Sequence, residues 1–388
     1  MERCCHCLVR RLLSSRSTFQ SIIIKGYPKY STQSEAVHVQ SAETYQSNAV
    51  SPPNSFCGRS HSCGELTSSQ VGETVTLCGW LQFQRMGGRF ITLRDAYGTT
   101  QVTITDDKQG LAEMCSKLGY ESVLTVEGTV ASRPEGQHNK EMVTGAIEVL
   151  ASDITVLNPC RKDLPFQMHD FHKVRESLRL EYRYLDLRHT QIQRNLRLRS
   201  KVIMKARDYL CNQHGFVDVE TPTLFRKTPG GAKEFVVPTH TPGMYYTLPQ
   251  SPQQFKQLLM VGGLDRYMQI ARCYRDETAK PDRQPEFTQV DIEMSFASQE
   301  NIKGLTEGLL EAMWPDTEWG RLQTPFPRMT YADAMGQYGI DKPDTRFEMK
   351  LTDVTPLVAD CGLEVVANAA SKHPEYSVKA VNFQDAGV

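Results

Sequence analysis

The residues best suited to chemistry lie in the stretch 271–296. Arg275 closes an apolar run there, and the acids Asp291 and Glu293 lie in a later run that alternates polar and apolar residues. A fixed guanidinium can bind a phosphate through two parallel hydrogen bonds. The carboxylates can bind an ammonium group or a metal. A site that holds an anion close to a cation suits an amino acid together with a nucleotide.

Two strands joined by a basic loop are the elements that would position these side chains. The loop contains prolines together with Lys280 and Arg283, and the second strand begins near Glu286. The alternative is an ordinary charged hairpin, which needs no such arrangement of proline, arginine and acid. The apolar members predicted for the second strand are Phe287, Val290, Ile292, Met294 and Phe296.

The sequence of this loop and of the residues around it resembles a known motif. ArgAspGlu at 275–277 and AspArgGlnProGluPheThrGln at 282–289 resemble motif 2 of the class II aminoacyl-tRNA synthetases, in the form typical of the aspartyl enzymes. The resemblance implies that Arg275 is catalytic, because it spans the amino acid carboxylate and the α-phosphate of ATP. It also implies that Phe287 stacks on adenine. The implied ATP-binding residues are Arg275, Asp276, Glu277, Gln284 and Phe287.

Residues 248–260 form the segment predicted to recognise the amino acid. Lys256 lies near the start of a predicted helix, where the helix dipole favours anions, and it adds a full positive charge. Without its neighbours, Lys256 would equally be a surface lysine. By resemblance this segment binds aspartate, and a lysine here argues against a cationic amino acid. The implied aspartate-binding residues are Ser251, Gln253, Lys256, Arg275, Gln289 and Asp291, with Glu293 lining the pocket.

The implied reaction explains why the candidates are cations and acids. A carboxylate attacks the α-phosphorus of ATP, so the enzyme must neutralise and position two anions. No general base is needed, because the attacking carboxylate is already ionised. The second step would transfer the aspartyl group to a ribose hydroxyl at the 3′ end of tRNA(Asp). The resemblance therefore implies an aspartate–tRNA ligase with ATP and aspartate as substrates.

Short alternating strands precede this region. Segments near 75–83, 90–95, 100–104, 122–130 and 146–150, with a helix near 110–118, fit a Greek-key barrel of OB type, although another small β-barrel remains possible. OB barrels bind single-stranded nucleic acid by stacking and charge. From its residue type alone, Phe90 is as well explained by a core position as by a stacking role. The resemblance implies four anticodon-contacting residues: Arg85, Phe90, Gln101 and Glu148.

A helix over 196–210 with Gly215 at its end, a strand over 216–220 and Pro222 resemble motif 1 of the family. The apolar positions predicted for this helix are Leu198, Val202, Met204 and Tyr209. The resemblance implies a homodimer whose interface includes Pro222. The Gly-rich segment 228–235 resembles the loop that closes over the amino acid. Gly230 departs from the bacterial pattern, which has a glutamate there.

Composition limits the class of protein. Among 388 residues, the charged fraction of 23% and the apolar fraction of 39% are ordinary for a soluble protein, and no run is long enough to span a membrane. The net charge of −1 means that RNA binding requires local basic patches. The first thirty residues are basic with Glu2 as the single acid, which is typical of a mitochondrial transit peptide or of a disordered basic tail. We therefore predict the mitochondrial matrix.

The predicted organisation is multidomain α+β. It comprises a transit peptide and linker (1–55), an OB-fold anticodon-binding domain (56–157), a hinge (158–180), a class II catalytic domain with an antiparallel sheet (181–327) and an incomplete inserted domain (328–388). Residues 328–354 resemble the bacterial-type aspartyl enzymes where they enter that inserted domain, which the lysyl and asparaginyl relatives lack. A C-terminally truncated synthetase is therefore predicted.

The family's motif 3 and the ligands of Mg²⁺ would lie beyond residue 388, so no metal ligand is assigned within the chain. We expect these residues alone not to aminoacylate. The alternative is a non-catalytic fragment that binds tRNA or dimerises. Whether tRNA(Asn) is also charged stays open.

Overall fold

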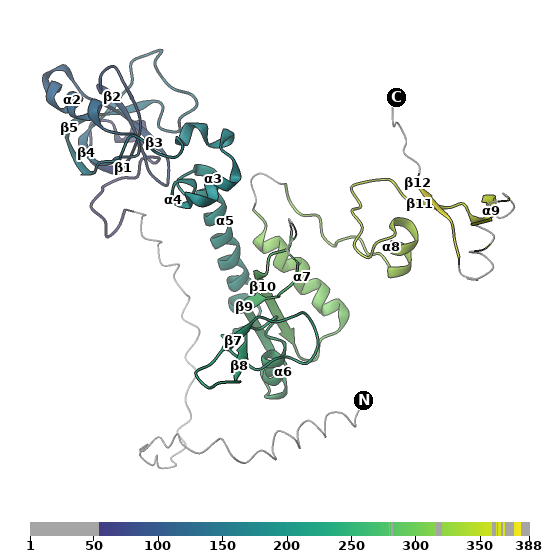
Figure 1. The fold of residues 1–388 in the computed structure, drawn as a ribbon. Helices are drawn as coiled ribbons and strands as arrows, with labels where there is room; N and C mark the ends of the chain where they lie inside the picture. Colours follow the sequence, from purple (N-terminus) through teal and green to yellow (C-terminus); the bar gives the residue numbers. More distant parts are fainter. Residues whose placement is uncertain are drawn as a thin grey trace, which may run out of the picture.

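The computed structural model describes residues 54–278, 280, 282–315, 320–358, 362, 364–365, 368 and 376–381. The predicted transit peptide and nearly all of the predicted linker lie outside these residues. Figure 1 shows a barrel, a helical connector, a module built on a small sheet, and a C-terminal group of short elements.

Five strands close into a barrel in the order β1-β2-β3-β5-β4. The pairs are antiparallel except β3 with β5. This topology confirms the predicted OB fold. The barrel elements are η1 (Ser68–Gln70), β1 (Thr74–Arg85), β2 (Phe90–Arg94), β3 (Thr99–Thr103), η2 (Asp106–Lys108), α2 (Gln109–Lys117), β4 (Val123–Ser132) and β5 (Ile147–Asn158).

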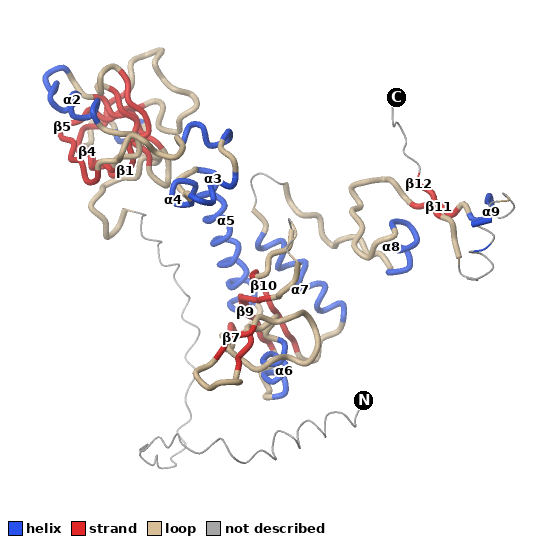
Figure 2. Tube along the Cα trace, viewed as in Figure 1, coloured by secondary structure: helices blue, strands red, loops and turns tan. Residues whose placement is uncertain are grey.

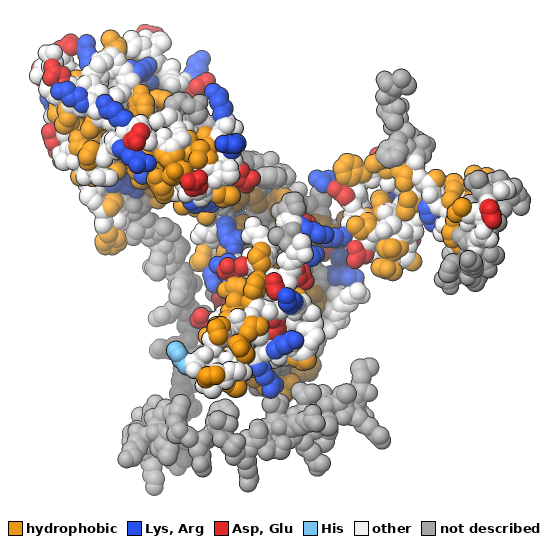
Figure 3. Space-filling view, viewed as in Figure 1, with side chains coloured by type: hydrophobic (Ala, Val, Ile, Leu, Met, Phe, Trp, Pro, Cys, Tyr) orange, Lys and Arg blue, Asp and Glu red, His pale blue; other side chains and the backbone are white. Residues whose placement is uncertain are grey.

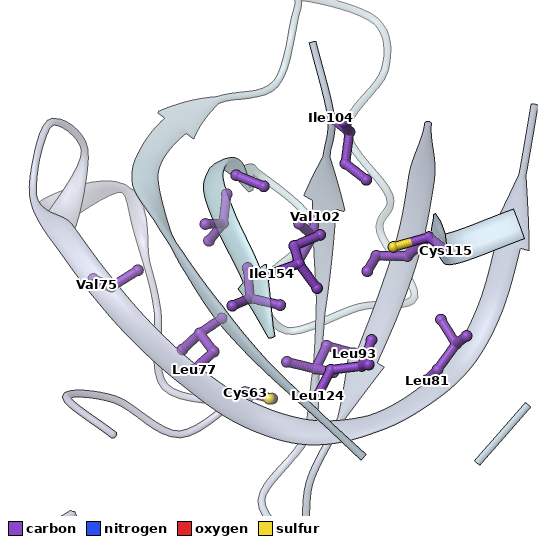
Figure 4. Packing of buried hydrophobic residues seen from close by; sticks show 14 of the residues in the cluster. Cys63, Val75, Leu77, Leu81, Leu93, Val102, Ile104, Cys115, Leu124 and Ile154 are labelled. Atoms are coloured by element: carbon purple, nitrogen blue, oxygen red, sulfur yellow. The ribbon is translucent and has the colours of Figure 1, made fainter. Parts of the chain in front are cut away.

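Alternation of apolar and polar residues explains why these segments form a barrel. Every second residue of β1 from Val75 to Leu81 is buried, and the inward side chains of all five strands form one buried cluster (Figure 4). The turn after β1 needs glycine at Gly88, because its φ is +89° and a Cβ there would lie 2.2 Å from the carbonyl oxygen of Ala112.

The last barrel strand is longer than its sequence indicates. We predicted a strand over 146–150, whereas β5 continues to Asn158. Its second half carries polar residues such as Ser152 and Asp153, and the pairing with β4 shifts register near Gly128. A β-bulge breaks the period-two pattern, so the alternation ends earlier than the strand.

A helical connector joins the barrel to the sheet module (Figure 1). His189 caps α5, since its Nδ1 accepts a hydrogen bond from the Gln191 backbone N–H. The helix is then prolonged by a π-helical turn. The connector elements are η3 (Met168–Lys173), α3 (Glu176–Glu181), α4 (Arg183–Asp186), α5 (Thr190–Arg207) and η4 (Asp208–Gln213).

The predicted apolar stripe of this helix is partly wrong. Leu198 and Met204 are exposed, whereas Ala206 and Leu210 are fully buried against the sheet. Ala206 and Leu210 are four residues apart and therefore share the face of the helix that meets the sheet, whereas Met204 lies on a different face.

The sheet of the second module is mixed, which corrects the antiparallel sheet that we predicted. β9 and β10 are antiparallel, but the short β6 pairs with β9 in parallel. A helix and a long connection separate β6 from β9, so a parallel partner is sterically available. The elements are β6 (Val217–Asp218), β7 (Val236–Pro238), β8 (Tyr245–Thr247), α6 (Gln253–Val261), β9 (Arg266–Tyr274), β10 (Glu286–Met294) and α7 (Gln299–Met313).

The two faces of this sheet differ in chemistry. Met268, Ile270 and Ile292 pack on one face against Leu210 and the α7 residue Leu309. The other face carries Tyr267, Gln269, Gln289, Asp291 and Glu293, because side chains alternate along each strand. The apolar face anchors the sheet, and the polar face is left for a ligand.

Two of the apolar members predicted for β10 do not belong to its apolar face. Phe287 is an odd-numbered residue and shares the polar face with Gln289, whereas Val290, Ile292 and Met294 lie on the opposite side. Phe296 follows the strand with a φ of +56° and is fully exposed.

Beyond this module the described chain forms α8 (Tyr331–Tyr338), β11 (Leu351–Asp353), α9 (Thr355–Val358) and β12 (Lys379–Val381). β11 pairs only with β12 in the part of the chain that the structure describes. Figure 2 shows these elements set apart from the β9–β10 sheet.

Candidate functional site

A buried lysine is the centre of the polar face. Lys256 extends from α6 and is only 8% exposed. Its Nζ lies 2.8 Å from Oδ1 of Asp291 and 3.2 Å from Oε2 of Glu293. The other oxygen of Asp291, Oδ2, is buried without a hydrogen-bond partner among the described residues. A buried unpartnered carboxylate oxygen is costly, so this arrangement suits a ligand that supplies a donor.

The charges of the polar face reinforce each other. Burial lowers the pKa of Lys256, but hydrogen bonds and charges from Asp291 and Glu293 outweigh it and raise the pKa above its usual value. Burial, with the Asp291 charge, also raises the pKa of the Tyr267 hydroxyl. Lys256 is therefore cationic and Tyr267 neutral at physiological pH. Lys256 lies near the start of α6, as predicted, but it is a buried cation paired with two acids and not a free charge.

Arg275 and Phe287 lie side by side at the end of the same face. The guanidinium carbon of Arg275 is 5.2 Å from the centre of the Phe287 ring. Nε of Arg275 is buried and has no hydrogen-bond partner among the described residues. A half-buried guanidinium beside an aromatic ring suits a phosphate next to a planar base. The residues present thus fit a nucleotide.

The remaining predicted ATP-binding residues lie in and beside the loop between β9 and β10. Asp276 pairs with Lys233 at 2.9 Å, and Glu277 pairs with Arg283 at 3.1 Å. Gln284 is exposed. These residues are near one another in the chain, but the structure does not bring Gln284 into contact with the Arg275–Phe287 pair.

The Gly-rich loop is tied to the site by two residues that we did not single out. The Gln250 side-chain amide accepts from the Ala232 N–H and donates to Thr228 Oγ1 and the Gly230 carbonyl. Glu234, only 8% exposed, accepts from the Thr228 N–H. A carboxylate after Gly230 and Gly231, together with the ProGln pair at 249–250, was the signal available in the sequence.

The predicted amino acid-binding residues are only partly gathered. Gln289 accepts a hydrogen bond from the Cys273 thiol at 3.2 Å and shares the polar face with Asp291. Ser251 lines a small pocket with Thr228 and Glu234. Gln253 is exposed at the first turn of α6. The structure therefore joins Lys256, Asp291 and Gln289, and it leaves Gln253 apart from them.

The four predicted anticodon residues form one connected row on the barrel. Nη2 of Arg85 donates to Oε1 of Gln101 at 3.0 Å, and Nε2 of Gln101 donates to Oε2 of Glu148 at 2.9 Å. The Arg85 guanidinium lies 6.0 Å from the Phe90 ring centre. Phe90 is half-buried and absent from the core cluster, so its ring is available at the surface.

The predicted interface residue Pro222 is exposed after β6. Figure 3 shows apolar groups at the surface of the module that carries β7, β8 and α6. The exposed apolar residues before and after Pro222 in the chain include Leu196, Met204, Val217 and Leu224.

The described residues lack two kinds of feature, a metal-binding cluster and a membrane-spanning helix. They contain no cluster of three or more His, Cys, Asp or Glu side chains arranged to hold a metal ion. Among those same residues, none of the helices combines the length and apolar character that crossing a bilayer requires.

A barrel of OB topology followed by a sheet with one polar, charge-paired face is the architecture of a synthetase. Residues 175–380 match the family model described as tRNA synthetases class II (D, K and N), and residues 75–157 match that of the OB-fold nucleic acid binding domain. The chain belongs to the class II tRNA synthetases of the D, K and N group. The predicted family is confirmed.

The chain is also similar to individual named proteins of this family. The chain is 56% identical over 334 residues to "Aspartate--tRNA ligase, mitochondrial" of Mus musculus, covering 86% of this chain and 50% of the relative. It is 50% identical over 317 residues to "Aspartate--tRNA(Asp/Asn) ligase" of Synechococcus sp. (strain CC9605), covering 80% of this chain and 52% of the relative. The chain thus spans about half the length of the curated relatives that it matches.

Solved structures agree on the fold. An aspartyl tRNA synthetase from Entamoeba histolytica is similar with a TM-score of 0.58 at 21% identity, covering 78% of this chain and 69% of that one. A putative aspartyl-tRNA synthetase from Leishmania major has a TM-score of 0.59 at 24% identity, covering 70% of this chain and 54% of that one. These similarities confirm the predicted fold class.

Proposed function

We propose that this chain carries the aspartate-recognising part of an aspartate–tRNA ligase, which activates aspartate with ATP and transfers it to tRNA(Asp). The observation that carries the proposal is the buried Lys256 beside Asp291 and Glu293. A fixed cation next to two carboxylates can receive a side-chain carboxylate and an α-ammonium group at neighbouring points. The pairing is complementary to aspartate and opposes a cationic side chain.

Activation follows from the charges around this centre. Arg275 neutralises the aspartate α-carboxylate and the α-phosphate, so that the two anions can approach. Phe287 supports the adenine ring, and Asp276, Glu277 and Gln284 provide further ATP contacts. Asp291 takes the substrate ammonium through its unpartnered Oδ2, with Gln289 on the same face of the sheet. Ser251 and Gln253 would contact the substrate only if it extends beyond this face. Mg²⁺ would neutralise the phosphates, as the resemblance to the family implies.

Recognition of tRNA is proposed for the barrel. Arg85, Gln101 and Glu148 form a hydrogen-bonded row whose donors and acceptors can read base edges, and Phe90 provides a stacking surface beside it. A row held by its own hydrogen bonds loses little conformational entropy on binding, which favours discrimination between bases.

A homodimer is proposed through the surface around Pro222. Leu196, Met204, Val217 and Leu224 are each between 45% and 59% exposed, and exposed apolar side chains can mark an interaction surface. Sedimentation equilibrium of the wild type and of Met204→Glu would test this. The proposal requires a dimer that the glutamate dissociates, and a wild-type monomer at micromolar concentration would contradict it.

The mitochondrial matrix is the proposed location, because the basic N-terminal composition agrees with relatives that are named mitochondrial. The domain division at 55, 157, 180 and 327 is likewise proposed. It assigns RNA recognition and aspartate activation to separate folding units.

Binding of a non-hydrolysable aspartyl-adenylate analogue, measured by calorimetry, tests the proposed site. Arg275→Ala should weaken binding at least roughly tenfold, because it removes a charge-assisted contact to phosphate. Arg272→Ala is the matched control, since Arg272 is exposed on the opposite side of the same strand. Equal losses in the two variants would contradict the proposed role of Arg275.

A further inference from the structure

A carboxylate of the barrel is shared by two arginines, one from each side of the junction with the connector. Glu121 precedes β4, Arg94 ends β2, and Arg188 lies between α4 and α5. Nη2 of Arg94 lies 2.7 and 2.6 Å from the two oxygens of Glu121. Nη1 of Arg188 lies 3.0 Å from Oε2 of the same carboxylate. The Glu121 carboxylate thus links the barrel to the connector, and its partner Arg188 lies 67 residues further along the chain.

The contact is reciprocal. Nη1 of Arg94 donates to the backbone carbonyl of Arg188 at 2.7 Å, while the Arg188 guanidinium lies 5.3 Å from the centre of the Trp80 ring in β1. Each arginine therefore contacts the segment to which the other belongs. Such an interlocked pair fixes rotation as well as distance, because Arg94 uses Nη2 for the carboxylate and Nη1 for the carbonyl, and each hydrogen bond is directional.

A second contact between the connector and the barrel is made by α5. Nη1 of Arg197 in α5 donates to the Ala96 carbonyl at 2.8 Å, and its guanidinium lies 4.6 Å from the Tyr97 ring centre. Two attachment points, one before α5 and one within it, define the direction in which the helix leaves the barrel. Because α5 continues to the β9–β10 sheet, its direction also sets where the sheet module lies (Figure 1).

The shared carboxylate is buried and held in place. The side chain of Glu121 is 3% exposed and that of Arg94 is 6% exposed. Glu121 adopts a φ of +70°, and its N–H donates to the Leu81 carbonyl at 2.7 Å. Loss of the carboxylate would leave two guanidinium groups facing each other without a counter-charge, which is strongly unfavourable in a buried site. The barrel interior itself does not need this charge, since its core cluster is apolar.

We propose that Glu121 is a positioning residue that sets the orientation of the barrel relative to the sheet module. Its consequence for RNA rests on the proposed function: a tRNA that contacts both modules requires them at a fixed separation. With Glu121 in place, the anticodon contacts and the contacts near the amino acid site act together as a two-point attachment. Without Glu121, the barrel still binds the anticodon part of the RNA. The effective concentration of the rest of the tRNA at the amino acid site is then lower, because the two modules are no longer held at a fixed separation.

The orientation is measured directly, without RNA. Spin labels are attached through non-canonical amino acids at the exposed Glu113 of α2 and the exposed Gln257 of α6, and their distance distribution is recorded in the full chain. Glu121→Gln should broaden the distribution clearly. Arg188→Gln should broaden it too, and it alters no barrel residue. The matched control is Asp106→Asn, which removes the 2.6 Å pair with Arg89 inside the barrel and should leave the distribution unchanged.

Binding of two RNAs by unlabelled protein supplies the second readout. Glu121→Gln and Arg188→Gln should bind an isolated anticodon stem-loop like the wild type, and should bind whole tRNA(Asp) transcript roughly tenfold more weakly. If Glu121→Gln fails to fold, it will also lose binding to the stem-loop. The result for Arg188→Gln then decides whether the proposal holds. A narrow wild-type distance in Arg188→Gln would overturn the proposal. A wild type that binds neither RNA would refute the proposed function, while the distances would still decide the positioning role.

Discussion

The barrel and the sheet module solve the burial of polar groups in different ways. The barrel closes its hydrogen bonding on itself and fills its interior with apolar side chains, and its candidate RNA contacts lie outside this apolar cluster, with Gln101 9% exposed. The sheet module has a small apolar cluster under α5 and α7 and places a charged centre, Lys256 with Asp291 and Glu293, on the other face. In the described chain, β10 pairs only with β9.

The difference connects stability with function. A surface that binds RNA can be changed without disturbing a closed barrel, because its residues contribute little to the core. A buried charge centre cannot be changed so freely, since each partner compensates the desolvation of the others. We therefore expect substitutions at the barrel surface to affect binding alone, and substitutions at the lysine centre to affect folding and binding together.

The largest effect is expected from Lys256→Met. Removal of one partner leaves buried carboxylates unpaired and should cost about 4 kcal/mol of unfolding free energy in the sheet module. Hydrogen exchange read peptide by peptide should show faster exchange in β9 and β10 and unchanged exchange in β1–β5. Lys303→Met, which removes the exposed pair with Glu300 in α7, is the control and should change little. Equal destabilisation of the barrel and the sheet module would contradict the expectation that the lysine centre stabilises the sheet module alone.

In the opposite direction, Leu77→Ala should destabilise the barrel by about 3 kcal/mol, because it leaves a cavity in a fully buried position. Urea unfolding followed by exchange in β1 and β4 measures the loss. Val71→Ala, at an exposed position before β1, serves as the control. Protection of the β9–β10 amides should stay at the wild-type level, and its loss would show that the modules do not unfold separately.

A smaller effect is expected at the barrel surface. Phe90→Ala should weaken binding of the anticodon stem-loop by about 2 kcal/mol through loss of base stacking, without a change in melting temperature. Phe83→Ala removes another exposed aromatic ring of β1 that lies outside the Arg85–Glu148 row. Equal effects of the two substitutions on RNA affinity would assign Phe90 to general packing.

The smallest effect concerns pH at the start of α5. Burial, with the neighbouring His172, lowers the pKa of His189 below 6.5. Because the folded state binds the proton less well than the unfolded state, this contribution to stability is present above the unfolded pKa and is lost as the pH falls through the folded pKa. Acidification below about pH 6.5 should therefore loosen α5, seen as faster exchange of its first amides.

The control for this titration is His189→Asn, which keeps a capping acceptor and removes the ionisable ring. Its α5 amides should show no such pH dependence. Persistence of the acid effect in this variant would assign the titration to another group.

The sequence predicted strongly patterned parts better than strained ones. The barrel strands and the β9–loop–β10 unit follow from alternation and turn residues, and the family motifs located Lys256, Arg275 and Asp291. The part of β5 after residue 150 was not predicted, because a β-bulge breaks the alternation of apolar and polar residues there. The buried stripe of α5 was partly missed because it passes through Ala206, a small residue that gives little apolar signal, while the larger Met204 is exposed.

Long-range partners were the other limit. The pairing of Lys256 with Asp291 joins residues 35 apart, and the link from Glu121 to Arg188 joins residues 67 apart. Local patterns carry no information about such distances. Gln250 and Glu234 were also missed, since their role comes from holding a loop in place and not from a recognisable motif.

The most direct test of the charge centre is a comparison of three adenylate analogues that differ only in the amino acid. Affinities of the wild type for non-hydrolysable aspartyl, asparaginyl and lysyl adenylates would be measured under one set of conditions. The paired lysine predicts that the aspartyl analogue binds at least roughly a hundredfold more tightly than the lysyl analogue, and more tightly than the asparaginyl one. Equal affinities, or a preference for the lysyl analogue, would contradict the assignment of Lys256 as the residue that selects aspartate.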